Sequence, residues 1–230
     1  MQKGSGAASS SLTDILASLV AVFVLLFVAA QNNRGAGVVT ARDVLIKQLR
    51  GELVTAGLDS AAIDSIPNDP STVLVILPDS VLFERGDSRM SAAGQNVVRI
   101  ATPLLAGVIC ADSIRQTLDQ VVVEGHTDNT IPFGMRPEAG RMFNLELSQR
   151  RSMNFVATST ATLAERDTLL ECYLGLVSAT GRGQENPLPR IPADSSPQRR
   201  VVLRIRLKTE IRDSVRIVQD VIGGGGAENP

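Results

Sequence analysis

The feature that most constrains this chain is a long apolar run near its N-terminus, within the stretch SLTDILASLVAVFVLLFVAAQNN. Every residue from Ile15 to Ala30 is apolar except Ser18. The hydrocarbon core of a bilayer is about 30 Å thick, and a helix needs about 20 residues to cross it. We therefore predict one transmembrane helix over residues 12–30, preceded by a short cytoplasmic tail over residues 1–11.

An acid stands at the cytoplasmic start of this predicted helix. Asp14 directly precedes the run and lies inside the bilayer boundary if the hydrocarbon core ends at Ala30. A charge at the centre of a bilayer costs about 2.5–3.5 kcal/mol on insertion scales, and less near the edge. Asp14 is a candidate helix N-cap, with Ser11 and Thr13 as rivals. It is also a candidate ion-carrying carboxyl, and because one helix encloses no channel, that role requires a multi-span partner.

A cleaved signal peptide is the alternative explanation of the apolar run. Lys3 supplies a positive charge ahead of the run, and FVAAQ contains the small residues of a cleavage site. A single distant Lys and an acid at the mouth of the run are unusual for a signal peptide, so a retained helix is favoured. A lipoprotein signal is excluded because no cysteine follows the run.

The composition excludes several classes of function. A chain of 230 residues has room for one membrane segment and one domain of ordinary size. Its net charge of −1 and aromatic content of 3% favour no nucleic-acid surface. One histidine and two cysteines are too few for most catalytic metal sites, and we find no Ser/His/Asp set or phosphate loop. We therefore expect no enzyme, no bound metal and no cofactor.

Behind the apolar run, the pattern predicts a periplasmic linker with a helix over residues 31–71. The helix extends from Val38 to Leu58, where apolar residues recur at helical spacing. The repeating apolar residues are Leu45, Leu49 and Leu53. At the other end of the chain, residues 209–230 contain the amphipathic stretch EIRDSVRIVQDVI and a polar, Gly-rich tail.

Residues 72–208 predict an α+β domain in the order β-α-β-α-β-β, with helices on one face of the sheet. The predicted strands are TVLVILPDSVLF, LDQVVVEGHTDN, LVSATGRGQENPL and RRVVLRIRLK. The predicted helices extend from Ser91 to about Val108 and over NLELSQRRSMNFVATSTATLAERDTLLECYLGL. The last strand alternates apolar and basic residues, as a half-buried strand does.

Four motifs of this domain resemble the OmpA-like peptidoglycan-binding domain: VVVEGHTDN, NLELSQRRS, GRGQENP and QRRVVLRI, in this order. The resemblance covers residues 73–208. In that family, the Asp of the HTD turn and an Arg of the following helix hold the diaminopimelate of the cell-wall peptide. The resemblance places these two residues at Asp128 and Arg151. The neighbouring site residues that it implies are Thr127, Asn144 and Leu147.

The chemistry of this pair suits such a ligand. Diaminopimelate carries an ammonium and a carboxylate on one carbon, so an acid beside a guanidinium is complementary to it. The alternative is that Asp128 and Arg151 only pair with each other across the turn. We expect His126 to be a hydrogen-bonding turn residue, and Arg199 and Arg200 to support the strand edge. The stretch NTIPFGMRPEAGRMF after the HTD turn is longer than usual in the family, which gives it room to reshape the pocket.

The apolar segment TDILASLVAVFVLLF resembles the membrane helix of MotB and its relatives, in which an Asp at the start of a single helix carries the driving ion. Stator B subunits combine such a helix with a wall-binding domain on one chain. The resemblance implies that Asp14 carries H⁺ or Na⁺. It also implies a homodimer inside a ring of five MotA-like multi-span subunits, in the bacterial inner membrane, with the N-terminus in the cytoplasm and the C-terminal domain in the periplasm.

Two stator systems and one passive role fit these features. The spacer of about 40 residues between Ala30 and Thr72 and the short tail MQKGSGAASS resemble ZorB, the MotB-like subunit of the Zorya anti-phage system, more than flagellar MotB. A passive tether between the inner membrane and peptidoglycan is the alternative from another class. Asp14 distinguishes the stator role from the tether, because a tether gains nothing from a carboxylate in the membrane.

The two cysteines predict one disulfide, Cys110–Cys172, in the oxidising periplasm. Each cysteine lies near the end of a helix that leads into a strand, and both helices should pack on the same face of the sheet. Their Cα atoms should then lie within the range of about 4.4–6.8 Å that a disulfide requires. The alternative is two buried free thiols.

Overall fold

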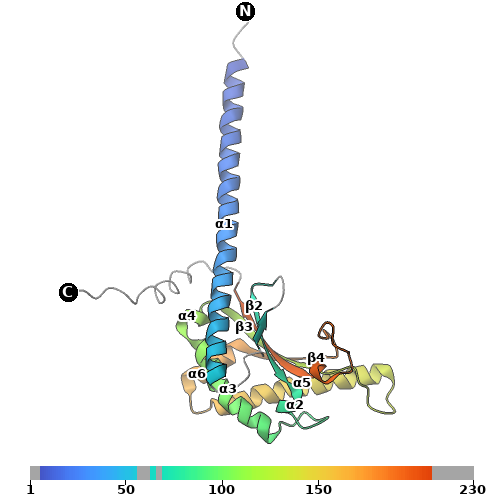
Figure 1. Ribbon diagram of the computed structural model, residues 1–230. Coiled ribbons are helices and arrows are strands. Elements are labelled where there is room, and N and C mark those ends of the chain that lie inside the picture. Colours follow the sequence, from blue (N-terminus) through green and yellow to red (C-terminus); the bar gives the residue numbers. More distant parts are fainter. Residues whose placement is uncertain (1–5, 56–62, 66–68, 209–230) are drawn as a thin grey trace, which may run out of the picture.

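In the computed structural model, residues 6–55, 63–65 and 69–208 are described, and they form one long helix and an α+β domain (Figure 1). The elements are α1 (Gly6–Thr55), β1 (Ile63–Ser65), β2 (Thr72–Pro78), α2 (Asp79–Leu82), α3 (Ala92–Cys110), α4 (Asp112–Arg115), β3 (Leu118–His126), α5 (Pro137–Thr162), α6 (Asp167–Leu176), β4 (Val177–Gly183), η2 (Ser196–Gln198) and β5 (Arg200–Leu207). The amphipathic stretch predicted within residues 209–230 lies outside the described residues.

The most extended element is α1, a continuous helix of 50 residues. The sequence predicts a membrane helix and a separate linker helix, whereas the structure joins them through the polar stretch QNNRGAG. At 1.5 Å per residue, α1 is about 75 Å long. Its C-terminal part packs on the domain through Leu45, Leu49 and Leu53, and its N-terminal part projects away from it (Figure 1).

Among the described residues, one helix is long and apolar enough to cross a membrane by length and composition, and a second segment is apolar but shorter. The shorter segment is Leu16–Ala29 of α1, in which every residue is exposed. The long helix is α3, with 19 residues and a mean hydropathy of 1.2. We assign α3 to the core of the domain, because Val98, Ala106 and Ile109 are fully buried and belong to one apolar cluster with the strands. Leu16–Ala29 is therefore the segment whose apolar surface is left uncovered in the described part of the chain.

The strands form one sheet in the order β1-β2-β5-β3-β4. Only the β3–β4 pair is parallel among the described pairs, and the others are antiparallel. Alternate residues of the central strands, such as Val123 and Leu203, are buried under α1, α3 and α5. The predicted α+β fold is thereby confirmed. The predicted second helix is two helices, because the chain leaves α5 after Thr162 and begins α6 at Asp167.

Two glycines let α5 lie directly on the sheet. A Cβ on Gly125 of β3 would lie 2.1 Å from the carbonyl oxygen of Ser148, and one on Gly181 of β4 would lie 2.5 Å from the amide nitrogen of Gln149. The amide of Gly181 donates to Gln149 Oε1 at 2.6 Å, and that of Gly183 donates to Ser148 Oγ at 2.8 Å. A side chain at either contact would push α5 away, so the glycines of the EGH and TGRG motifs set the position of this helix.

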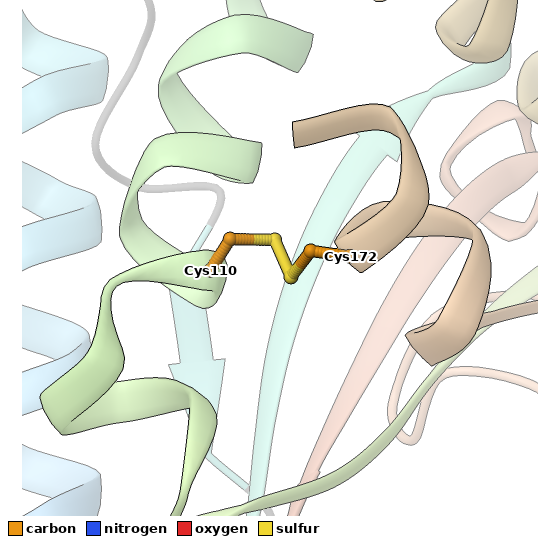
Figure 2. Close-up of a disulfide and its surroundings, with 2 residues drawn as sticks. All are labelled: Cys110 and Cys172. Carbon is orange, nitrogen blue, oxygen red and sulfur yellow. A yellow bond between two sulfur atoms is a disulfide. The ribbon is translucent and has the colours of Figure 1, made fainter. Parts of the chain in front are cut away.

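A disulfide joins Cys110, the last residue of α3, to Cys172 of α6, with the Cα atoms 6.0 Å apart (Figure 2). The cysteines are 62 residues apart in the sequence. The bridge therefore links two neighbouring helices across a loop that contains α4, β3 and α5.

The double variant Cys110→Ser/Cys172→Ser is expected to lose about 2–4 kcal/mol of unfolding free energy, because the bridge closes a long loop of the unfolded chain. Urea unfolding of the purified protein, followed by circular dichroism, measures the loss. Reduced wild-type protein should behave like the double variant. Alkylation of both cysteines without prior reduction, detected by mass spectrometry, would contradict the bridge.

Candidate functional site

The candidate site lies where β2 and β3 end and β5 begins. The strand register pairs both Pro78 and His126 with Arg200. The residues just beyond these positions, Asp79 and Arg199, are therefore neighbours, and the amide of Asp79 donates to the carbonyl oxygen of Arg199 at 3.1 Å. The HTD turn follows His126 at the same end of the sheet.

Asp128 on this turn has a well-defined set of partners. Its Oδ2 atom lies 2.5 Å from Arg199 Nη1, and its Oδ1 atom accepts from the amide of Thr130 at 3.1 Å. Asn144 of α5 donates from Nδ2 to the carbonyl oxygens of Asp128 and Thr130, at 3.3 and 3.1 Å. The turn is thus fixed from two sides, and the Asp128 carboxylate is held against a guanidinium.

Arg151 of α5 is held on three sides and is only 2% exposed. Its Nε donates to the carbonyl oxygen of Asp87 at 3.0 Å, and its Nη1 lies 3.0 Å from Asp79 Oδ1. Its guanidinium carbon lies 5.4 Å from the centre of the Phe83 ring, which is the geometry of a cation–π contact. Arg151 therefore forms the buried part of the site.

Asp79 connects the two halves of the site. Besides its contact with Arg151, its Oδ2 atom lies 3.8 Å from Arg199 Nε. The four charged side chains therefore alternate in sign, in the order Arg151, Asp79, Arg199, Asp128. Burial raises the pKa of Asp79, against the opposing effect of Arg151 and Arg199, and burial lowers the pKa of Arg151, against the effect of Asp79. The interior thus penalises both charges of this pair.

The structure excludes one alternative and corrects one expectation about these residues. Asp128 and Arg151 do not pair with each other, because Arg199 and Asp79 lie between them as their separate partners. Arg199 is more than a support of the strand edge: its side chain is 36% exposed and contacts Asp128 directly. Asp79 is a site residue that the motifs do not point to, because the stretch TVLVILPDSVLF is predicted as one strand, whereas β2 ends at Pro78 and Asp79 begins α2. Arg200, by contrast, does support the neighbouring loop, donating to the carbonyl oxygens of Gln198 and Asn186.

The other predicted site residues have supporting positions. Asn144 holds the HTD turn, as described above. Thr127 is buried, and its amide donates to the carbonyl oxygen of Gly183 at 2.8 Å. Its Oγ1 atom makes no hydrogen bond within the described part of the chain. Leu147 is half-buried on α5, one turn before Arg151.

The stretch after Asp128 is shorter as a loop than the sequence suggests, because α5 begins at Pro137. The amide of Asn129 donates to the carbonyl oxygen of Ala193 at 3.0 Å. Ile131 packs so closely on α5 that a Cβ on Gly140 would lie 2.4 Å from its side chain. The loop is thus anchored at its base, while the side chain of Phe133 is fully exposed.

A second charged cluster supports β3 beside the site. Glu124 is buried and accepts from Arg182 and Arg204 at 2.9 and 3.1 Å, and His126 Nε2 lies 3.7 Å from it. Burial raises the pKa of Glu124, but the contacts with His126, Arg204 and Arg182 outweigh it and hold the pKa well below its usual range. Burial lowers the pKa of His126, so this side chain is neutral at neutral pH, with Nδ1 3.3 Å from the carbonyl oxygen of Glu185.

The described side chains show no metal site, and they do not include that of Asp14, the predicted ion carrier. Within residues 6–55, 63–65 and 69–208, no group of three His, Cys, Asp or Glu side chains is arranged to hold a metal ion. Asp14 belongs to α1, but its side chain lies outside those that the structure describes. Its ion-carrying role stays a prediction.

The variant Glu124→Gln is expected to lose about 1–3 kcal/mol of unfolding free energy at pH 7, because it weakens the bonds to two guanidinium groups. The pKa of Glu124 is lower in the folded than in the unfolded chain, so its stabilising effect is present above about pH 4.5 and declines as the pH falls further. Urea unfolding at pH 7 and pH 3 should show a smaller difference between variant and wild type at pH 3. An equal difference at both values would contradict this account.

Comparison with known proteins places the fold. No protein-family model matches the sequence, and no curated protein does. A solved MotB-like protein from Desulfovibrio vulgaris matches with a TM-score of 0.54 at 20% identity, over 76% of this chain and 99% of the other. The OmpA-like domain of FopA1 from Francisella tularensis matches with a TM-score of 0.40 at 19% identity, over 63% of this chain and 79% of the other. The periplasmic domain of Helicobacter pylori MotB matches with a TM-score of 0.44 at 15% identity, over 72% of this chain and 92% of the other. These two TM-scores are below 0.5, so the first structure carries the assignment: the chain shares the fold of that MotB-like protein.

Proposed function

We propose that this chain is a membrane-anchored subunit whose outer domain binds peptidoglycan through the charged cluster at the end of the sheet. The observation that carries the proposal is the contact between Asp128 and the half-exposed guanidinium of Arg199. The α-carbon of a diaminopimelate residue bears an ammonium and a carboxylate, which match this acid and this guanidinium. Arg151, for which the family resemblance implies contact with the ligand, is buried and pairs with Asp79.

The membrane anchor is the exposed apolar part of α1. Leu16–Ala29 lies within the predicted span over residues 12–30, which has about the 20 residues that a helix needs to cross a bilayer. The disulfide favours an oxidising compartment for the domain, since such bonds persist in the periplasm and not in the cytosol. These observations support an inner-membrane protein with its N-terminus in the cytoplasm and its domain in the periplasm.

The anchor also supports a stator role, in which Asp14 carries H⁺ or Na⁺ for a ring of MotA-like subunits, five per dimer of this chain. A homodimer is supported by a groove of about 920 Å³ between α1 and α3. Residues of both helices line this groove, among them Lys47 of α1 and Leu104 of α3, so it offers a second copy both charged and apolar side chains.

Within this class, we favour a ZorB-like subunit of an anti-phage system over flagellar MotB. The support is the compact spacer: about 40 residues separate Ala30 from Thr72, and much of the spacer is the last part of α1. A helicase and a nuclease encoded beside a MotA-like gene would agree with this assignment, and flagellar genes would contradict it.

The variants Asp128→Ala and Arg199→Ala are each expected to weaken binding to purified peptidoglycan, because each leaves one charge of the ligand unmatched, at about 1.5–3 kcal/mol. Co-sedimentation with sacculi measures the effect. Arg150→Ala is the matched control, since Arg150 is an exposed residue of α5 that pairs with Glu146 outside the cluster. Unchanged binding of both site variants would exclude this site. Arg151→Ala is less informative, because removing one partner of a buried ion pair costs about 3–5 kcal/mol of stability.

The variant Asp14→Asn is expected to abolish ion-driven activity while leaving assembly intact, because Asn has nearly the same shape but takes up and releases no proton near neutral pH. A cell-based assay with the cognate multi-span subunit measures activity, and native mass spectrometry of the co-expressed complex measures assembly. Asp14→Glu retains a carboxyl and should retain part of the activity. Normal activity of the Asn variant would refute the ion-carrier role and favour a passive tether.

A further inference from the structure

We propose that Asp79 is an internal competitor for the carboxylate of the ligand, so that this residue limits the affinity of the site and makes it depend on pH. The proposal rests on the proposed binding of a zwitterionic amino-acid group at Asp128 and Arg199. It concerns a residue that neither the sequence motifs nor the fold assignment points to.

The Asp79 carboxylate lies beside the same guanidinium groups from which a ligand carboxylate would accept hydrogen bonds. Its two oxygens point to different guanidinium groups, with Oδ1 3.0 Å from Arg151 Nη1 and Oδ2 3.8 Å from Arg199 Nε. The first distance is that of a close ion pair, whereas the second is too long for a hydrogen bond. Arg199 is therefore the cation that Asp79 attracts without holding firmly, and it is also the more exposed one.

The pair with Arg151 is itself incompletely satisfied. Asp79 Oδ1 and Arg151 Nη1 lie at ion-pair distance, but neither atom makes a hydrogen bond of acceptable geometry within the described part of the chain. Buried polar atoms without hydrogen bonds are rare in proteins and costly to maintain. A ligand carboxylate that accepts well-aligned hydrogen bonds from these guanidinium groups would therefore satisfy them better than Asp79 does.

The charges around Asp79 explain how its ionisation affects a ligand. It faces Arg151 from α5, Arg199 from the segment before β5, and Asp128 from the HTD turn. With all four groups ionised the cluster is neutral, and it attracts a carboxylate only through local contacts. Protonation of Asp79 leaves the cluster with one net positive charge and removes the attraction of Asp79 for both guanidinium groups, while Arg199 keeps its contact with Asp128 and Arg151 its bond to the carbonyl oxygen of Asp87. Burial raises the pKa of Asp79, so this change occurs at a higher pH than for an exposed Asp.

The variant Asp79→Asn tests the proposal in the full-length protein. Asn has nearly the same shape as Asp and keeps an oxygen within reach of Arg151, but it removes the acid that this buried guanidinium faces, so circular dichroism must first show that the variant folds. Isothermal titration with a stem peptide that contains diaminopimelate should give a Kd about tenfold lower than that of the wild type at pH 7.5. Glu84→Gln is the matched control, because it removes the same charge from an exposed position nearby and should leave the Kd unchanged.

The pH dependence gives a second measurement that needs no variant. Between about pH 7.5 and about pH 5, wild-type affinity should rise on acidification, because the raised pKa of Asp79 makes its proton uptake begin at a higher pH than that of an exposed Asp, and Asp79→Asn should lack this rise. An Asn variant that folds but binds no more tightly would overturn the proposal. If that variant does not fold, a wild-type affinity that is constant or falls over this range would overturn it. If the wild type binds no stem peptide, the proposed function is overturned as well. If the wild type binds and only the effect of Asp79 is missing, the proposed function stands and the role of Asp79 alone is overturned.

Discussion

The site depends on the direct contact between α5 and the sheet. Because Gly125 and Gly181 have no side chains, the backbone of α5 at Ser148 and Gln149 lies against β3 and β4. From this position the helix organises the loops at the end of the sheet: Asn144 holds the HTD turn, Arg151 bonds to the carbonyl oxygen of Asp87, and Asn154 donates to that of Ser88 at 2.7 Å. A shift of α5 would therefore misplace the acids of both turns together.

In the proposed function, the charged cluster combines a structural role with a binding role. A buried guanidinium such as Arg151 needs a nearby acid, and Asp79 supplies it at the cost of burying a second charge. A ligand that takes the place of Asp79 must therefore satisfy Arg151 at least as well. Arg199 differs, because its side chain is 36% exposed and contacts solvent as well as Asp128. The division between a buried, structural pair and a half-exposed, exchangeable pair follows from how deeply each arginine lies.

The sequence predicts the elements of the domain better than the partners within the site. The period-two pattern of β5 and the motif around Asp128 are local signals, and the predicted α+β fold is confirmed. The contact of Asp79 with Arg199 is not local: it follows from the register of β2 on β5, which joins positions more than a hundred residues apart. The sequence pattern does not predict the continuity of α1, for a different reason. Two glycines within QNNRGAG each cost about 1 kcal/mol in a helix, which predicts a break, yet the helix continues through them.

The continuity of α1 favours a load-bearing role of the chain over a passive tether. Between Ala29 and Ala41, where the helix begins to be buried on the domain, there are about 12 residues, or about 18 Å of helix. A flexible linker would let the domain move freely with respect to the membrane, whereas a helix packed through Leu45 and Leu49 fixes its position. In the proposed stator role, a force applied beside Asp14 must be resisted at the wall, and a stiff connection transmits that force. A passive tether needs only a maximum reach, so the stiffness of α1 is better explained by a chain that carries load.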